Sequence, residues 1–176
     1  LGFVIPTEWF QSVNPVFIIL LAPLFSMFWG FLSKRGKNPS IPIKMAMGMI
    51  LLGLGFVLVL GAVWQRGGDD ASVLVKANLL WLLGTYLMHT MGELCLSPIG
   101  LSMVSKLSPV RLASLMMGVW MLSSFFANIT AGFIASFFVS LGAMSIFAVI
   151  AVTSILLGLF LLAVSKWLTG KMHGVK

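Results

Sequence analysis

Long apolar stretches, separated by short polar or glycine-containing segments, run through the whole sequence. A helix needs about 20 residues to cross the hydrocarbon core of a bilayer. No stretch alternates apolar and polar residues with the two-residue period of a strand, and an open sheet cannot lie exposed to lipid. The pattern therefore predicts an all-α integral membrane protein with five transmembrane helices. Their expected ranges are 12–33, 45–65, 72–105, 109–139 and 143–168.

The segments at the two ends and the long third range carry further expectations. Residues 1–11 are either a lead-in outside the cytoplasm or the start of the first helix. Residues 169–176 are expected to form a cytoplasmic tail. The range 72–105 is too long for one straight span, so it either projects beyond the bilayer or bends near Pro98.

Two pairs of residues that end in proline are candidates for helix starts. Ser108 is placed to cap the fourth helix, with Pro109 at its first position. The pair Asn14-Pro15 has two interpretations. Either Asn14 caps the first helix, or that helix begins earlier, near Thr7, and Asn14 lies inside the membrane at a proline bend.

The composition agrees with a membrane protein and gives it an orientation. Hydrophobic residues make up 60% of the chain and charged residues 9%, whereas a soluble domain has roughly 25% charged residues. If all five helices cross, every basic residue except Arg66 and Lys76 lies at one end. Those residues are Lys34, Arg35, Lys37, Lys44, Lys106, Arg111, Lys166, Lys171 and Lys176. The net charge of +7 thus follows the positive-inside rule and does not indicate nucleic-acid binding. The C-terminus is predicted to be cytoplasmic, in a multi-pass plasma-membrane protein that we expect in a bacterial inner membrane.

Two smaller features bound the interpretation. Cys95 is the only cysteine, so an intrachain disulfide is excluded. The chain begins Leu-Gly-Phe rather than with Met, and we expect it to be a piece of a larger protein.

Glu93 is the acidic residue that falls in the middle of a predicted transmembrane helix. An ionisable group at that depth is costly, and it is a functional candidate by default. On a helix its face is shared by residues that are mostly polar or small. They are Tyr86, His89, Ser97, Gly100 and Leu101. This stripe predicts the wall of a water-filled cavity; the alternative is a buried network between helices that only fixes their packing.

The surroundings of Glu93 suggest what it does. Its protonation should depend on whether a cation is docked beside it, and no basic residue of this chain lies at comparable depth. The partner is therefore expected to be a substrate or another part of the protein. Pro98, one turn away, either loosens backbone carbonyls for gating or makes an ordinary kink. His89 is either a proton relay or a hydrogen-bonded packing group.

The fourth helix carries a second candidate region. Trp120 either lines a cavity or anchors the helix at the membrane interface, and Ser123 and Ser124 follow it by about one turn. Small and polar residues continue from Ser124 at intervals of four, which favours close helix packing. No nucleotide-binding loop, metal-ligand cluster or nucleophile–base pair is present in the sequence. We therefore expect neither an enzyme nor a cofactor. Protons are the expected coupling ion, because the protonation of Glu93 should depend on a docked cation.

Several of these segments resemble proton-dependent oligopeptide transporters. Trp9-Phe10-Gln11-Ser12-Val13-Asn14-Pro15, Leu21-Ala22-Pro23-Leu24-Phe25 and Trp29 resemble the loop and eighth helix of that family. The segment from Gly92 to Ser102, followed by Lys106-Leu107-Ser108-Pro109, is similar to the tenth helix. Met117-Gly118-Val119-Trp120, with Asn128 and Gly132, resembles the eleventh. The resemblance implies a major-facilitator fold of two six-helix bundles, of which this chain would supply helices eight to twelve.

The resemblance also implies roles for individual residues. Glu93 would receive the amino terminus of a peptide, couple the proton, and pair with a lysine of the N-terminal bundle. Asn14 would help to hold the same terminus. Trp120 would line a side-chain pocket beside Ser124. Ser97, on the Glu93 face, joins the expected substrate-binding residues, whereas Leu101 and Pro98 would belong to the cytoplasmic gate.

The implied function is a proton-coupled symporter that imports di- and tripeptides by alternating access. Its expected partners are the peptide, the N-terminal six-helix bundle and seventh helix of the same protein, and the lipid bilayer; no nucleic acid is expected. Two alternatives remain. One is a major-facilitator transporter of another solute, such as nitrate or a drug-like molecule. The other is a non-transporting membrane subunit that pairs with a partner through Glu93.

Overall fold

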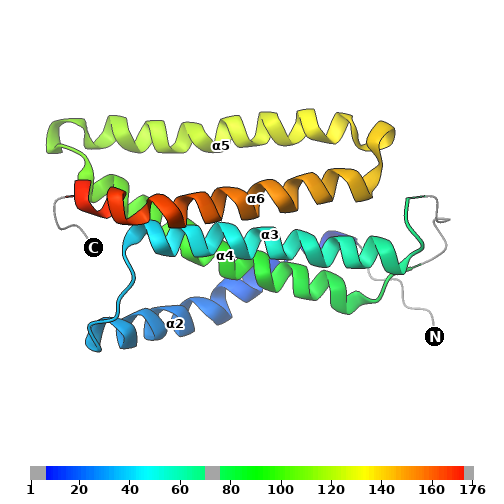
Figure 1. The fold of residues 1–176 in the computed structure, drawn as a ribbon, viewed down its shortest axis with the longest axis horizontal. Coiled ribbons are helices and arrows are strands. Elements are labelled where there is room, and N and C mark those ends of the chain that lie inside the picture. The colour runs from blue at the N-terminus through cyan, green and yellow to red at the C-terminus, as the bar shows by residue number, and fades with distance from the viewer. Residues whose placement is uncertain (1–6, 70–75, 173–176) are drawn as a thin grey trace.

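The computed structural model describes residues 7–69 and 76–172, and each regular element in that part of the chain is a helix (Figure 1). In chain order they are α1 (Thr7–Gln11), α2 (Val13–Lys34), α3 (Ile41–Gln65), α4 (Leu79–Leu107), the 3-10 helix η1 (Val110–Leu112), α5 (Ala113–Ser136) and α6 (Phe138–Lys171). Five segments are long and apolar enough to cross a membrane: Trp9–Lys34, Ile41–Gln65, Leu79–Leu107, Val110–Ser136 and Ser140–Lys171. The predicted all-α membrane fold with five transmembrane helices is confirmed.

The helix α3 forms the centre of the described bundle. It packs along its length against α4 and α6, while α2 packs on α4 and α5 makes slight contact with its neighbours (Figure 1). Glycines allow the close approach. A Cβ added at Gly48 would lie 2.8 Å from the carbonyl oxygen of Gly92 on α4. One added at Gly158 of α6 would lie 2.7 Å from Ile50 Cγ1 on α3. Such small residues are typical of helix interfaces in membranes, where backbones pack closely.

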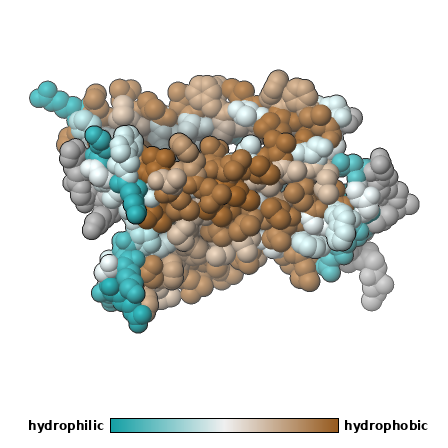
Figure 2. All heavy atoms as spheres, viewed as in Figure 1, coloured by the Kyte–Doolittle hydropathy of each residue, from teal (hydrophilic) through white to brown (hydrophobic). Residues whose placement is uncertain are grey.

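The surface of the bundle is divided into three zones. A broad apolar band lies between two ends where hydrophilic residues gather (Figure 2). The band includes large apolar side chains that face outward, with Ile19 72% and Phe160 67% exposed. No residue of α5 is buried within the described part of the chain. Such a surface is suited to lipid or to further helices of the same protein.

Two expectations about helix ends are wrong. The helix α4 begins at Leu79 rather than at residue 72: Lys76 to Asn78 are not helical, and Asn78 caps the helix by accepting from the Leu80 N–H at 2.9 Å. Residues 72–75 lie outside the described residues. Ser108 does not cap the following helix, because its hydroxyl donates back to the Val104 carbonyl at the end of α4. Pro109 has an extended backbone and precedes η1.

The beginning of the first transmembrane segment follows the second of its two interpretations. Helix α1 already begins at Thr7, and the Val16 N–H donates to the Ser12 carbonyl at 3.2 Å. Asn14 therefore lies within the helical segment Trp9–Lys34 rather than at its cap. Of the expected lead-in at residues 1–11, residues 1–6 lie outside the described residues. The expected tail at residues 169–176 begins too early, because α6 continues to Lys171, and residues 173–176 lie outside the described residues.

A contact between two loops fixes the start of the last transmembrane helix. The backbone of α6 is interrupted at Gly142, which has a φ of 77°. The Met144 N–H that follows donates to the Asp69 carboxylate, at 3.1 and 3.2 Å from its two oxygens. Asp69 thus acts as a helix cap from a distant loop, where a negative charge also complements the helix dipole.

We predict that Asp69→Ala destabilises the intact protein by about 1 kcal/mol, the usual effect of removing a capping side chain. Asp69→Asn should retain most of the stability, because the amide oxygen still accepts from the Met144 N–H. Thermal unfolding of the purified protein in detergent measures both variants. If the alanine variant unfolds at the wild-type temperature, the contact contributes nothing to stability.

Candidate functional site

Glu93 lies half-buried near the middle of α4, and its nearest polar partner comes from α2. Asn14 Nδ2 donates to Glu93 Oε2 at 3.1 Å. The Thr90 hydroxyl donates to Asn14 Oδ1 at 2.6 Å, and it also lies 2.8 Å from the Tyr86 carbonyl oxygen. Thr90 is fully buried, with 0% of its surface exposed. These contacts join α2 to α4 through a chain of hydrogen bonds that runs from Thr90 through Asn14 to Glu93.

The chain of bonds matters because Asn14 has two chemically different ends. Its amide nitrogen only donates and its amide oxygen only accepts. In the structure the nitrogen faces the Glu93 carboxylate and the oxygen faces the Thr90 hydroxyl. Hydrogen bonds to an ionised acceptor are roughly twice as strong as neutral ones. The amide therefore holds the carboxylate without neutralising its charge.

A cavity of about 470 Å³ opens beside Glu93. It is lined by Asn14, Leu52, Tyr86, His89, Glu93, Leu96 and Ser97. Tyr86, His89 and Ser97 are three of the residues that helical spacing places on the face of Glu93, whereas Gly100 and Leu101 do not line this cavity. No lysine or arginine is among the described residues that line it. Both interpretations of the stripe thus describe part of the site: a cavity is present, and so is a network between helices.

His89 packs against α3 and lines the cavity beside Glu93. Its ring centroid lies 4.7 Å from that of Phe56, and the ring occupies the space beside Gly55, where an added Cβ would overlap it. Its Nε2 is buried and has no hydrogen-bond partner within residues 7–69 and 76–172. The imidazole thus forms part of the wall of the cavity, and its role as a proton relay stays a prediction.

Trp120 and Ser124 lie apart from Glu93 in the structure. The Trp120 ring packs against Gly100, where an added Cβ would overlap it. Trp120 lines a different cavity, of about 370 Å³, between the end of α4, the Ser108-Pro109 turn and α5. Ser124 is exposed on α5 and lines neither cavity. The structure thus brings Asn14 and Ser97 to Glu93, but it does not bring Trp120 or Ser124 there.

The two expected gate residues lie further along α4, toward its C-terminal end. Leu101 is 40% exposed. Pro98 is exposed inside a continuous helix and borders a third cavity, which also contains Lys44 and Lys106. Neither is among the described residues that line the cavity beside Glu93, and their expected role in gating stays a prediction.

Thr90 is the member of the site that the sequence did not reveal. It precedes Glu93 by three positions, on a neighbouring strip of the helix surface, and its role depends on Asn14, which is 76 positions away. The available signal was a hydroxyl one turn from an intramembrane carboxylate. In the part of the chain that the structure describes, no group of three or more His, Cys, Asp or Glu residues is arranged to hold a metal ion.

Comparisons with known proteins show which family the chain resembles. A family model described as "POT family" matches residues 1–165. A peptide transporter of Yersinia enterocolitica subsp. palearctica is 43% identical over 137 residues, which are 76% of this chain and 26% of the relative. A di-/tripeptide transporter of Lactococcus lactis subsp. cremoris is 31% identical over 174 residues, which are 99% of this chain and 34% of the relative.

Solved structures give the same result. The crystal structure of a POT family transporter in complex with a thioalcohol-conjugated peptide superposes with a TM-score of 0.80 and 33% identity. The match covers 90% of this chain and 31% of that one. The chain therefore spans between about a quarter and about a third of the length of these relatives.

Proposed function

We propose that this chain, which belongs to the POT family, is part of a proton-coupled symporter that imports di- and tripeptides by alternating access. The relatives at 43% and 31% identity are named as peptide and di-/tripeptide transporters. The single observation that supports the proposal most is a half-buried carboxylate, in the middle of a membrane-spanning helix, that faces a cavity and is held by an amide rather than by a cation.

The cationic amino terminus of a peptide would dock at Glu93. An ammonium group donates three hydrogen bonds and accepts none, and the ionised carboxylate offers acceptor sites beyond the one used by Asn14. An ion pair in such a site is stronger than in water because the local dielectric constant is lower. Ser97 would lie along the same wall of the cavity.

Proton coupling follows from the cost of an unpaired charge in the membrane. When no cation is docked, an ionised Glu93 is costly at this depth, and a proton neutralises it. A proton, the amino terminus of the peptide and a lysine of the N-terminal bundle would thus occupy the carboxylate in turn. When the peptide docks, the proton displaced from Glu93 would pass to another group of the same protein, so that proton and peptide cross together and leave on the same side.

Asn14 would report the protonation state of Glu93 through the orientation of its amide. With Glu93 ionised, Asn14 Nδ2 donates to it and the Thr90 hydroxyl donates to Asn14 Oδ1. When Glu93 is protonated it would donate to Asn14 Oδ1 after a half-turn of the amide. Asn14 Nδ2 would then donate to Thr90 Oγ1, and the Thr90 proton would turn to the Tyr86 carbonyl, 2.8 Å away. All hydrogen bonds are satisfied in both states.

The rest of the mechanism requires the remainder of the protein. The N-terminal six-helix bundle and the seventh helix would close the other side of the cavity and cover the exposed face of α5. Trp120 and Ser124 would form a pocket for a peptide side chain once those helices are in place. Leu101 and Pro98 would gate the cytoplasmic side. The end of the bundle that carries most lysines and arginines would face the cytoplasm of a bacterium, with the C-terminus on that side.

Uptake by the intact protein in liposomes tests the proposal. We expect a labelled dipeptide to accumulate above its outside concentration when the lumen is alkaline, and to leave again when a protonophore is added. An unlabelled tripeptide should compete and nitrate should not. Uptake of labelled nitrate without uptake of the dipeptide would favour a transporter of another solute, and the absence of uptake of both would favour a non-transporting subunit.

A further inference from the structure

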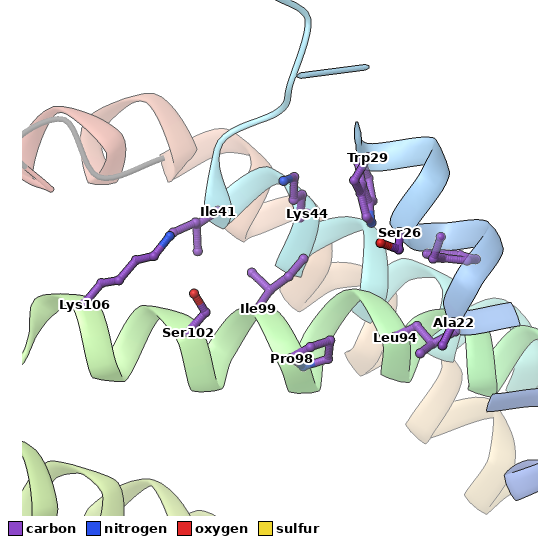
Figure 3. Close-up of a pocket in the computed structure, with 11 residues that line it drawn as sticks. Ala22, Ser26, Trp29, Ile41, Lys44, Leu94, Pro98, Ile99, Ser102 and Lys106 are labelled. Carbon is purple, nitrogen blue, oxygen red and sulfur yellow. The ribbon is translucent and has the colours of Figure 1, made fainter. Parts of the chain in front are cut away.

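A separate cavity lies at the basic end of the bundle, between α2, α3 and α4 (Figure 3). Its volume is about 420 Å³. The lining changes from basic and polar to apolar along the length of the cavity. Lys106, Ser102 and Lys44 lie toward one end, and Leu94 and Ala22 lie toward the other (Figure 3). The cavity is therefore amphipathic, with the basic part near the helix ends and the apolar part deeper in the bundle.

Trp29 forms part of this wall and has an unused donor. Its ring meets the edges of Phe25 and Phe28, with centroids 6.5 and 5.0 Å away. The Lys44 ammonium lies 4.8 Å from the centroid of the same ring, a cation–π contact. The Nε1 atom is buried and has no hydrogen-bond partner among the described residues. A buried donor without an acceptor is costly and rare, so an acceptor is expected here.

The charges of the cavity are unbalanced. Lys44 and Lys106 both line it, and their like charges repel each other. Within residues 7–69 and 76–172, no aspartate or glutamate lines the cavity. The cavity offers many hydrogen-bond donors: two ammonium groups, an unused indole N–H and the hydroxyls of Ser26 and Ser102. This set of donors suits an anion with several oxygen acceptors.

We propose that this cavity binds the phosphate headgroup of an anionic lipid from the leaflet at the basic end of the bundle. Lys44, Lys106 and Trp29 Nε1 bind the phosphate, and the start of an acyl chain lies along the apolar wall formed by Pro98 and Leu94. The apolar wall distinguishes a lipid from free phosphate, which gains nothing from it. Basic pockets between transmembrane helices are suited to anionic headgroups.

Lipid binding by the purified intact protein tests the proposal. Native mass spectrometry in a neutral detergent measures the apparent dissociation constant of the first bound lipid, with dioleoyl phosphatidylglycerol compared with dioleoyl phosphatidylcholine. We expect the wild type to prefer phosphatidylglycerol. The double variant Lys44→Gln/Lys106→Gln should bind it about 30-fold more weakly, from the usual contribution of a basic residue near an anionic lipid. Trp29→Phe, which keeps the ring but removes the N–H, should weaken binding about fivefold.

The matched control is Lys34→Gln/Lys37→Gln. It removes the same charge from the same end of the bundle, at exposed positions outside the cavity, and it should bind phosphatidylglycerol as the wild type does. Equal losses in both double variants would show a general charge effect and overturn the proposal. Displacement of the lipid by millimolar inorganic phosphate would assign the site to free phosphate instead. A wild type that binds neither lipid would overturn the proposal.

Discussion

Replacing Glu93 with glutamine in the intact protein should abolish the accumulation of peptide driven by a proton gradient. Glutamine has nearly the same shape, and its amide oxygen can still accept from Asn14 Nδ2. It cannot bind or release a proton, and it carries no charge to pair with an ammonium group. The free-energy cost of losing one partner of a desolvated charge pair is large. We therefore expect gradient-driven uptake into liposomes to fall by at least about 100-fold.

Exchange of peptide without a gradient separates coupling from folding in this variant. Exchange does not require Glu93 to change its protonation state in each cycle, and some exchange should persist in Glu93→Gln at raised peptide concentration. The matched control is Asp69→Asn, the same chemical change at an exposed site that is far from the cavity along the chain. It should transport as the wild type does. Accumulation of peptide against its gradient by Glu93→Gln would show that another group carries the proton.

The fold was predictable because it depends on segment length and apolarity. A bilayer requires helices of about 20 residues whose backbone groups are bonded internally, and five such segments appear in both the sequence and the structure. The ends of helices were less predictable. Ser108 is a good N-cap by type, yet its hydroxyl bonds to the Val104 carbonyl four residues back. Serine offers both contacts, and local sequence does not decide between them.

The candidate site was predictable on one helix and not between helices. Helical spacing alone placed Tyr86, His89 and Ser97 beside Glu93, and all three line its cavity. The bond from Asn14 joins residues 79 positions apart, and its existence depends on how α2 packs on α4. Only the resemblance to a family suggested that Asn14 belongs to the same site as Glu93. The environment of Trp120 depends in the same way on how α5 packs, which no pattern within α5 specifies.

The basic cavity between α2, α3 and α4 is another feature that could not be predicted from the sequence. In the sequence, Lys44 and Lys106 are two of many basic residues at one predicted side of the membrane, and their charge is fully explained by orientation. Only the folded chain places them around Trp29, with its unused N–H. A positive-inside pattern can therefore contain a binding site that spacing along the chain does not reveal.

Replacing Thr90 with valine should weaken the coupling of proton to peptide while leaving peptide exchange nearly intact. Valine has almost the shape of threonine but cannot hydrogen-bond to Asn14 Oδ1. The Asn14 amide would then lose the partner that fixes its orientation toward Glu93. One hydrogen bond of ordinary strength corresponds to about a fivefold effect, so gradient-driven uptake should fall by about that factor. Thr90→Ser, which keeps the hydroxyl, should transport as the wild type does.

A double-mutant cycle of Thr90 and Asn14 tests whether Thr90 acts through the Asn14 amide. Asn14→Leu removes the hydrogen bond to Glu93 itself, and we expect driven uptake to fall by about 30-fold, since bonds to charged groups are the stronger ones. If Thr90 acts only through the Asn14 amide, the double variant Asn14→Leu/Thr90→Val should be no worse than Asn14→Leu alone. Initial rates of uptake for all four proteins measure this cycle. Losses that multiply instead would show that Thr90 acts independently of Asn14, and the amide of Asn14 would then have no role in reporting the protonation of Glu93.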